Sequence, residues 1–219
     1  LYFIMLNKVK IAVDAMGGKG SPKKIIEGIE ISLKSNQENF FYLYGKKDLL
    51  EKEISKRKVL QKYCEIINTE DIVLDDESAL TGAKKSKNSS MWKAVESLRE
   101  KNSDISLSAG NTGALLVISR LLLKTIAGIS KPALAGLWPN QNSMNVVLDL
   151  GANIECTEKN LTDFACMGSA LFKSLFTNDK PKIALLNVGL EEYKGNDVLK
   201  KTFSILKENK MKNFEFCGY

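Results

Sequence analysis

The chemistry open to this chain is limited first by an absence, because its 219 residues include no histidine. Without histidine there is no Ser-His-Asp or Cys-His charge system, no histidine base and no imidazole metal ligand. The four cysteines, Cys64, Cys156, Cys166 and Cys217, show no Cys-x-x-Cys spacing, which predicts buried thiols in a reducing compartment rather than a disulfide framework. Any chemistry must therefore use backbone amides, Lys, Asn, Ser, Thr, carboxylates or thiols.

One loop that could bind an anion covers residues 14–22, between an apolar run and a helical pattern. It begins with Asp14 and contains Gly17 and Gly18. Glycines let backbone N–H groups approach an anion at the start of the next helix. The loop is neither Gly-x-Gly-x-x-Gly nor a Walker loop, so a plain tight turn is the alternative.

A second loop covers residues 108–114, with Gly110, Asn111, Thr112 and Gly113 between an apolar run and an apolar helix. Small residues let a ligand reach the backbone, and a helix start offers unpaired N–H groups. The loop therefore predicts a cradle for phosphate or an oxyanion. A simple Asn or Thr helix cap beside close-packed glycines is the alternative.

Two further loops, residues 148–153 and 185–195, place an Asn beside Gly at the end of an apolar run. They contribute Asn153 and Asn187, and the second adds Lys194 close to two glutamates. These charges could orient a phosphate, and a surface ion pair is the alternative.

Lysines also precede a helix start at residues 84–91. Lys85 could dock an acidic group, and Ser89 is suited to capping a helix that runs to Arg99. The alternative for the lysines is a solvated loop.

The elements that must position these loops alternate along the chain. Strands are predicted at residues 9–14, 40–44, 64–67, 105–107, 133–137, 146–150 and 183–186. Helices are predicted from about residue 21 and at 48–58, 89–99, 115–126, 161–176 and 198–208, with a long loop at 69–87. This alternation predicts an α/β fold with a largely parallel, doubly covered sheet, whose ligands gather at the carboxyl ends of strands. The apolar helix 115–126 is expected to be buried.

The net charge is +6, and the surplus lies near the start, where residues 1–60 hold 12 basic and 7 acidic side chains. Such a balance can serve nucleic acid, an anionic membrane or an acidic or phosphorylated partner. Only Arg57, Arg99 and Arg120 are arginines. Because nucleic-acid recognition favours the guanidinium group, no nucleic-acid partner is expected.

Taken together and in order, these segments resemble the bacterial phosphate acyltransferase (PlsX) family of phospholipid synthesis. The matching motifs are VDAMGG (13–18), SSM (89–91), SAGNTGAL (108–115), LDLGAN (148–153), FACMG (164–168) and LLNVG (185–189), followed by Glu191-Glu192 and Lys194-Gly195. Each motif is weak alone, and six in series are specific.

The resemblance implies acyl transfer from acyl-[acyl carrier protein] to inorganic phosphate, giving an acyl phosphate. It also implies a three-layer α/β/α fold like that of phosphotransacetylases and isocitrate dehydrogenase, a homodimer, and no metal or organic cofactor. A cytoplasmic location is expected, with loose attachment to the inner face of the membrane.

In this interpretation phosphate lies near Gly110, Asn111, Thr112 and Lys194, while Asn187 points toward the thioester carbonyl. Asn111, Asn187 and Lys194 are the expected catalytic residues. The expected phosphate- or substrate-binding residues are Asp14, Gly17, Gly18, Lys85, Ser89, Gly110, Asn111, Thr112, Gly113 and Asn153.

The chain departs from the family pattern in two ways. Lys19 replaces the usual Asp after the paired glycines, and the family continues beyond the segment matching residues 214–219. Because the resemblance begins at about Lys8, residues 1–7 are interpreted as a tag or start-site extension, and 8–219 as the N-terminal portion of the acyltransferase. The alternatives are a catalytically inactive binding protein and a phosphotransacetylase or phosphate butyryltransferase that uses acyl-CoA.

Overall fold

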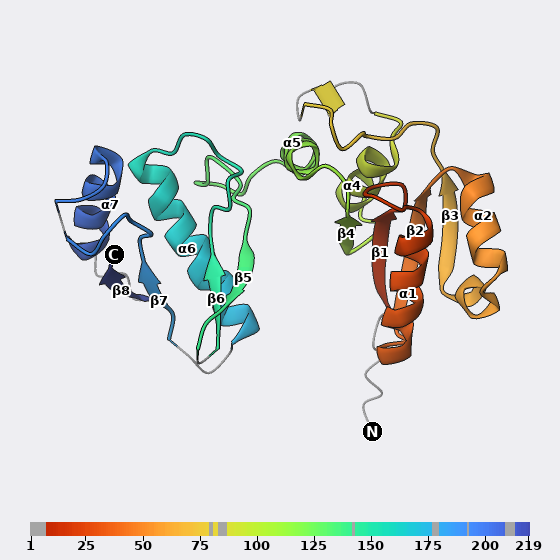
Figure 1. Ribbon diagram of the computed structural model, residues 1–219, viewed down its shortest axis with the longest axis horizontal. Coiled ribbons are helices and arrows are strands. Elements are labelled where there is room, and N and C mark those ends of the chain that lie inside the picture. Colours follow the sequence, from red (N-terminus) through yellow and green to blue (C-terminus); the bar gives the residue numbers. More distant parts are fainter. Residues whose placement is uncertain are drawn as a thin grey trace. The chain divides into compact units, whose positions relative to one another are not determined.

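The computed structural model describes residues 8–78, 81–82, 87–141, 143–176, 180–191, 193–208 and 213–219. The chain forms two compact units, Leu1–Lys124 and Thr125–Tyr219 (Figure 1).

The first unit contains a four-stranded parallel sheet in the order β3-β2-β1-β4. Its strands are β1 (Val9–Asp14), β2 (Asn39–Gly45), β3 (Cys64–Asn68) and β4 (Ile105–Ser108). Its helices are α1 (Lys23–Ser35), α2 (Lys47–Ser55), the 3-10 helix η1 (Lys58–Lys62), α4 (Ser90–Arg99) and α5 (Thr112–Leu123). Because the strands are parallel, the loops after all four of them leave the same edge of the sheet.

Alternation along β1 divides its side chains between two helical layers. Ile11 and Val13 belong to a buried cluster with Ile26 of α1 and residues of α2. Ala12 faces the other way and packs with Ala94 of α4. The first unit is therefore a three-layer α/β/α sandwich, which confirms the predicted α/β class and parallel sheet.

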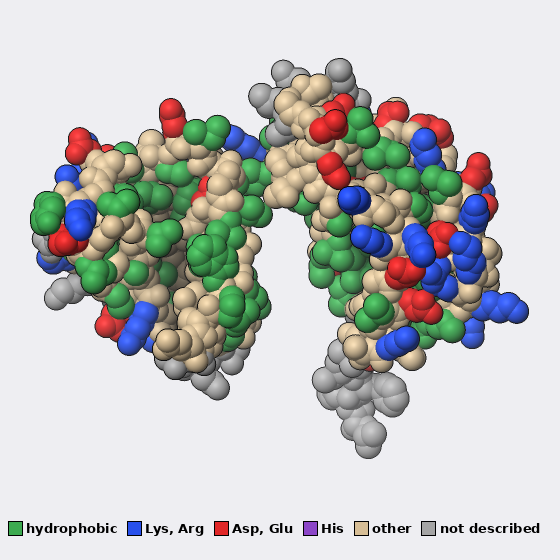
Figure 2. All heavy atoms as spheres, in the orientation of Figure 1, with side chains coloured by type: hydrophobic (Ala, Val, Ile, Leu, Met, Phe, Trp, Pro, Cys, Tyr) green, Lys and Arg blue, Asp and Glu red, His purple; other side chains and the backbone are tan. Residues whose placement is uncertain are grey.

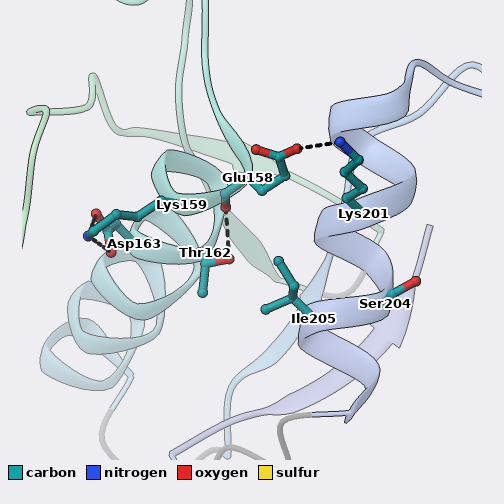
Figure 3. Close-up of a pocket in the computed structure, with 7 residues that line it drawn as sticks. All are labelled: Glu158, Lys159, Thr162, Asp163, Lys201, Ser204 and Ile205. Atoms are coloured by element: carbon teal, nitrogen blue, oxygen red, sulfur yellow. Dashed lines mark hydrogen bonds and ion pairs between the residues drawn. The ribbon is translucent and has the colours of Figure 1, made fainter.

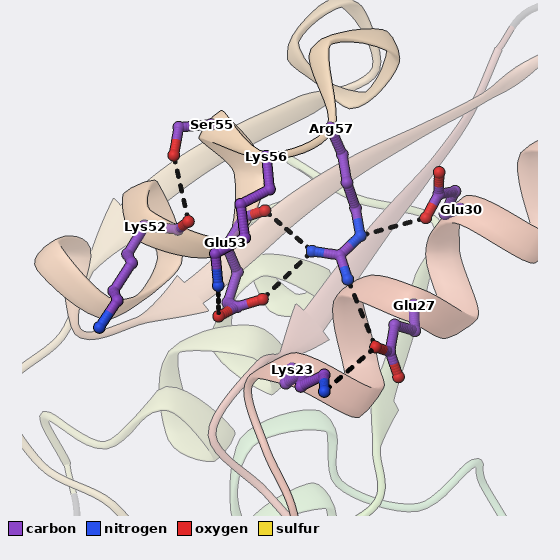
Figure 4. A network of polar contacts seen from close by, with 8 residues as sticks. All are labelled: Lys23, Glu27, Glu30, Lys52, Glu53, Ser55, Lys56 and Arg57. Carbon is purple, nitrogen blue, oxygen red and sulfur yellow. Dashed lines mark hydrogen bonds and ion pairs between the residues drawn. The ribbon is translucent and has the colours of Figure 1, made fainter.

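A polar network fixes α2 against α1 (Figure 4). Arg57, just after α2, contacts Glu30 at 3.1 Å and Glu27 at 3.4 Å on α1, and Glu53 of α2 at 3.1 Å. The Arg57 side chain is only 15% exposed. One planar guanidinium thus joins three carboxylates from two helices, a geometry that lysine does not offer.

The second unit combines two small sheets with two helices. Its elements are β5 (Gly136–Pro139), β6 (Met144–Val147), α6 (Glu158–Leu175), β7 (Lys182–Ala184), α7 (Asp197–Glu208) and β8 (Glu215–Gly218). Strands β7 and β8 are parallel. Ala165 of α6, Leu206 of α7 and Phe214 beside β8 meet in one buried cluster.

The largely parallel arrangement predicted for the strands does not extend to β5 and β6, which form an antiparallel pair. Residues 140–143 connect them, and a parallel crossover would need about a dozen residues or more. The turn is closed by Asn140, whose N–H donates to Ser143 O and whose Oδ1 accepts from Ser143 N. Both strands accordingly lie closer to this turn than predicted.

The prediction that the apolar helix is buried is also wrong. Ala114, Ile118 and Leu122 form the buried stripe of α5, whereas Leu121 is 56% exposed. The helix begins at Thr112, earlier than predicted, because Asn111 caps it. Apolar composition alone did not reveal that only one face packs.

Candidate functional site

The carboxyl edge of the first unit's sheet is organised around the buried carboxylate of Asp14, which is 1% exposed. Asp14 ends β1 and is the register partner of Ser108 at the end of β4. Ser108 Oγ donates to Asp14 Oδ2 at 2.7 Å and accepts from the N–H of Gly110 at 3.1 Å. This chain of hydrogen bonds fixes the backbone just before α5.

The two glycine loops interlock at this edge. A Cβ built on Gly17 would lie 2.9 Å from both Gly110 N and Ser108 Oγ. Gly18 has φ +84°, and a Cβ there would overlap the carbonyl of Ala109. Only residues without a side chain fit this approach, so the structure brings the predicted residues Gly17, Gly18 and Gly110 together.

The start of α5 combines a side-chain cap with unused backbone donors. Asn111 Oδ1 accepts from Ala114 N at 3.0 Å, which confirms that this Asn caps a helix. As the first residues of α5, Thr112 and Gly113 lack intrahelical acceptors for their N–H groups, and no described residue accepts from them. Two aligned donors at the positive end of a helix can hold an anion.

The side-chain amide of Asn111 already donates hydrogen bonds to another loop. Its Nδ2 donates to the carbonyls of Glu77 at 2.8 Å and Asp75 at 3.2 Å. The amide therefore anchors the loop after β3 to the start of α5. The contact of this side chain with phosphate stays a prediction, and the geometry favours positioning.

Ser89 is completely buried at the start of α4. Its Oγ accepts from Trp92 N at 3.1 Å, and its backbone bridges to Asp71. The predicted cap is confirmed, while substrate binding by Ser89 stays a prediction. Lys85 lies outside the described residues.

In the second unit, Asp149 organises the loop after β6. Its carboxylate accepts from Leu134 N at 2.9 Å, Asn153 N at 2.7 Å and Asn153 Nδ2 at 2.9 Å. Asn153 Nδ2 also donates to Pro132 O at 2.9 Å. The side-chain amide of Asn153 thus holds its own loop and joins it to Pro132, and its contact with substrate stays a prediction.

Asn187 and Lys194 meet in the loop after β7. Asn187 Nδ2 donates to Lys194 O at 3.3 Å, and Lys194 Nζ lies 2.9 Å from Glu191 Oε2. Hydrogen bonding from Lys194 lowers the pKa of Glu191, so this carboxylate is ionised at neutral pH. The surface ion pair, which was the alternative prediction for this loop, is therefore formed. A bound phosphate would share Lys194 with Glu191.

Sequence reasoning missed Ser108 and Asp149 as organising residues, although both lie inside the recognised motifs. The signal for Ser108 is its position opposite Asp14 in the parallel register, which requires knowledge of strand order. The signal for Asp149 is a short acidic side chain just before Gly151, where it can accept from the following backbone.

A separate cavity of about 690 Å³ lies between α6 and α7, and none of the predicted site residues line it (Figure 3). At its rim, Lys201 Nζ lies 3.5 Å from Glu158 Oε1. Within the described part of the chain, no group of three or more Cys, Asp or Glu side chains could hold a metal ion. No described helix is long and apolar enough to span a bilayer.

Fold and site define a class: α/β/α proteins with glycine-rich strand ends that meet at a helix start. The fold is similar to that of a phosphotransacetylase from Streptococcus pyogenes, with a TM-score of 0.69 and 16% identity over 96% of this chain and 67% of that one. A phosphotransacetylase from Staphylococcus aureus gives a TM-score of 0.63 and 15% identity over 97% and 68%. These likenesses confirm the expected phosphotransacetylase-like fold.

Sequence comparison narrows the class to a family. The profile described as "Fatty acid synthesis protein" matches residues 9–219, and the chain belongs to this family. It is 56% identical over 215 residues to a phosphate acyltransferase from Pelagibacter ubique, covering 98% of this chain and 64% of that protein. A phosphate acyltransferase from Ehrlichia ruminantium is 41% identical over 219 residues, covering 99% and 64%. The chain thus spans 64% of the length of these relatives.

Proposed function

We propose that this chain is the phosphate-binding portion of a phosphate acyltransferase that uses acyl carrier protein thioesters. The observation that carries the proposal is the cradle made by the interlocked glycine loops and the N–H groups of Thr112 and Gly113, for which no described residue is an acceptor. Membership in a family whose relatives are named phosphate acyltransferases supplies the reaction class.

In the proposed reaction, a phosphate oxygen attacks the thioester carbonyl, so a C–O bond forms and the C–S bond breaks. The thiolate leaves and takes a proton from solvent, giving acyl phosphate and the free thiol. Phosphate is already a competent nucleophile when it is held in position. The chain must therefore supply an anion cradle and donors for the developing oxyanion rather than a histidine base.

Each group at the first unit's edge has a role in this proposal. Thr112 and Gly113 donate backbone hydrogen bonds to phosphate, with the Thr112 hydroxyl as a further donor. Asp14 and Ser108 are positioning residues that hold Gly110 against them. Asn187 toward the thioester carbonyl, and Lys194 and Asn153 toward substrate, stay part of the proposal on the strength of the family motifs.

The test is release of free thiol from palmitoyl carrier protein in the presence and absence of phosphate. Ser108→Ala removes the link between Asp14 and Gly110, and we expect its KM for phosphate to rise about tenfold or more. Ser55→Ala, which loses only an exposed bond to Lys52 O, is the matched control. Release that does not depend on phosphate would contradict the proposal.

A second candidate is the same transfer from acyl-CoA, which the likeness to phosphotransacetylases favours. Comparing kcat/KM for palmitoyl-CoA and palmitoyl carrier protein separates the two. A folded protein that binds the carrier but releases no thiol would instead support the inactive binding protein.

The proposal extends to assembly and location. By its family motifs, the protein is proposed to act as a homodimer in the cytoplasm, loosely attached to the inner face of the membrane. Sedimentation velocity and flotation with anionic vesicles test these two points separately from turnover.

A further inference from the structure

Exposed lysines gather on one side of the edge that carries the proposed anion cradle. Lys19 lies in the loop after β1, with Lys23 and Lys24 at the start of α1, and Lys46 and Lys47 begin α2. All five side chains belong to exposed residues. In Figure 2, lysine and arginine side chains gather over α1 and α2, with carboxylates among them. We define these five residues as the lysine face.

Part of this charge is balanced within the unit. Lys23 and Lys47 each pair with a glutamate one turn along their own helix, at 3.9 Å and 3.7 Å. Lys19, Lys24 and Lys46 form no ion pair with any described residue. Three cations are thus available to a partner from solvent.

The lysines occupy helix ends where cations are least favourable, because a helix N-terminus is itself positive. Helix α1 has no acidic residue in its first turn, and neither N-cap residue, Pro22 or Lys46, makes a side-chain cap hydrogen bond. Helices α4, α5 and α6 by contrast begin with the caps Ser89, Asn111 and Thr157. At the start of α2, Asn68 Oδ1 accepts from Lys47 N at 3.0 Å, and Asp48 lies in the first turn. The lysines are therefore placed against the helix dipoles, and together with the positive helix ends they attract an anion.

The lysine face is continuous with the cradle. A Cβ on Gly45, at the end of β2, would lie 2.9 Å from the Met16 side chain, and Gly17 in the same loop lies against Gly110. The acidic segment at residues 70–77 belongs to the opposite layer, because Val73 packs with residues of α4 and α5. Among the described residues, the α1–α2 side of this edge carries the lysine face, whereas the α4–α5 side carries the five carboxylates of segment 70–77 with exposed Lys87 beside them.

We propose that the lysine face docks an acidic carrier protein, which delivers the thioester to the cradle from the α1–α2 side. This inference rests on the proposed function, because a carrier-bound acyl group must be presented beside phosphate. Complementary charge selects an acidic partner and speeds its encounter. The acidic segment 70–77 repels the same partner, so that the two charge signs together fix the side of approach.

The test measures association of palmitoyl carrier protein by stopped-flow fluorescence at low and high salt. We expect the triple variant K19E/K24E/K46E to associate at least about tenfold more slowly than wild type at low salt. The matched control is K34E/K58E/K62E, which makes the same charge change on exposed lysines at the opposite edge of the sheet, and it should keep the wild-type rate. The neutral variant K19Q/K24Q/K46Q should also associate more slowly than wild type, by a smaller factor. It tests the same lysines if the charge-reversed chain misfolds.

Turnover of palmitoyl-CoA with phosphate, measured on the same proteins, separates this inference from the proposed function. If K19E/K24E/K46E loses carrier association and K34E/K58E/K62E keeps it, the result supports docking on the lysine face, whether or not any thioester turns over. Equal association by both charge-reversed variants overturns it, even if phosphate-dependent turnover is observed. Wild-type protein that binds anionic vesicles but not the carrier also overturns it.

Discussion

Gly17 is the residue at which the loops of the first unit leave no space for a side chain. A Cβ there would overlap Asp14 Oδ2 and lie 2.9 Å from Gly110 N. We expect Gly17→Ala to lower the unfolding free energy by about 1–3 kcal/mol and phosphate-dependent turnover by about 100-fold, because the cradle shifts.

Urea unfolding and steady-state kinetics measure both effects of this substitution. Gly28→Ala is the control, since a Cβ on this α1 residue meets nothing within 4 Å and should stabilise the helix by about 1 kcal/mol. Wild-type kinetics in Gly17→Ala would mean that the interlocked loops do not position phosphate.

Asn111 has two separable duties, a cap through Oδ1 and an anchor through Nδ2. Asn111→Asp keeps the cap and removes the anchor, whereas Asn111→Ala removes both. We expect the unfolding free energy of Asn111→Ala to fall about 1 kcal/mol further than that of Asn111→Asp, because the cap is lost as well. Both variants should have a raised KM for phosphate. A normal KM in Asn111→Asp would show that the 74–77 loop is dispensable for the cradle.

Cys64 begins β3, where burial raises the pKa of its thiol to about 12. Since an ordinary thiol has a pKa near 8.5 and only the thiolate is nucleophilic, we expect labelling at pH 8 to be on the order of a thousandfold slower than in urea. Mass-spectrometric mapping with iodoacetamide tests this, with Cys217 as the internal reference, because Cys166 and Cys217 are exposed and the prediction of buried thiols is wrong for them. Equal labelling of both thiols in folded protein would contradict the packing of β3.

At the scale of elements, the sequence predicts those whose signal is local. Strand β1 and helix α7 agree with their apolar periods, and α4 agrees because Ser89 is a recognisable cap. Strand β8 was missed, because four residues ending in Gly218 carry no period of their own. It becomes a strand by pairing with β7, which is distant in sequence.

The candidate site likewise divides into features with a local sequence signal and features without one. Composition alone identified the glycine loops, since small residues at strand ends need no knowledge of neighbours. The hydrogen bonds from the Asn111 side-chain amide could not be predicted from sequence, because its acceptors lie 34 to 37 residues earlier in the chain. Nor could the complete burial of Ser89, which depends on the segment that bridges to it at Asp71.

The network that joins α1 and α2 should make stability depend on pH. Hydrogen bonds from Lys56 and then Arg57 lower the pKa of Glu53 in the folded protein. Between the lowered pKa of folded Glu53 and its ordinary pKa of about 4.3, the unfolded chain therefore binds more protons than the folded one. The stabilisation is fully present above this range and is lost as the pH falls through the lowered pKa.

The acid limb is the fall in unfolding free energy as the pH decreases. Glu53→Gln should flatten it, as measured by urea unfolding between pH 7 and pH 3. The control Glu51→Gln alters an exposed carboxylate 3.7 Å from Lys47 on the same helix and should leave the limb in place. Parallel acid limbs in wild type and Glu53→Gln would argue that other carboxylates govern acid unfolding.

At the scale of the whole molecule, each unit has a buried core of its own. Clusters around Leu43, Ile118 and Ala12 belong to the first unit, and the cluster around Leu206 belongs to the second. The cradle donors, together with Asp14 and Ser108, lie entirely in the first unit, whereas Asn187 and Lys194 lie in the second. Phosphate binding and acyl transfer should therefore be separable.

We expect a fragment of residues 8–124 to unfold cooperatively and to bind phosphate without turning over any thioester. Titration with phosphate should shift the amide resonances of Gly110, Thr112 and Gly113, because anions at a helix start polarise those N–H groups. A fragment of residues 125–219 is the matched control and should show no saturable shifts. If that fragment bound phosphate and the first did not, the anion site would belong to the loop of Asn187 and Lys194, and the roles of cradle and thioester contact would be exchanged between the two units.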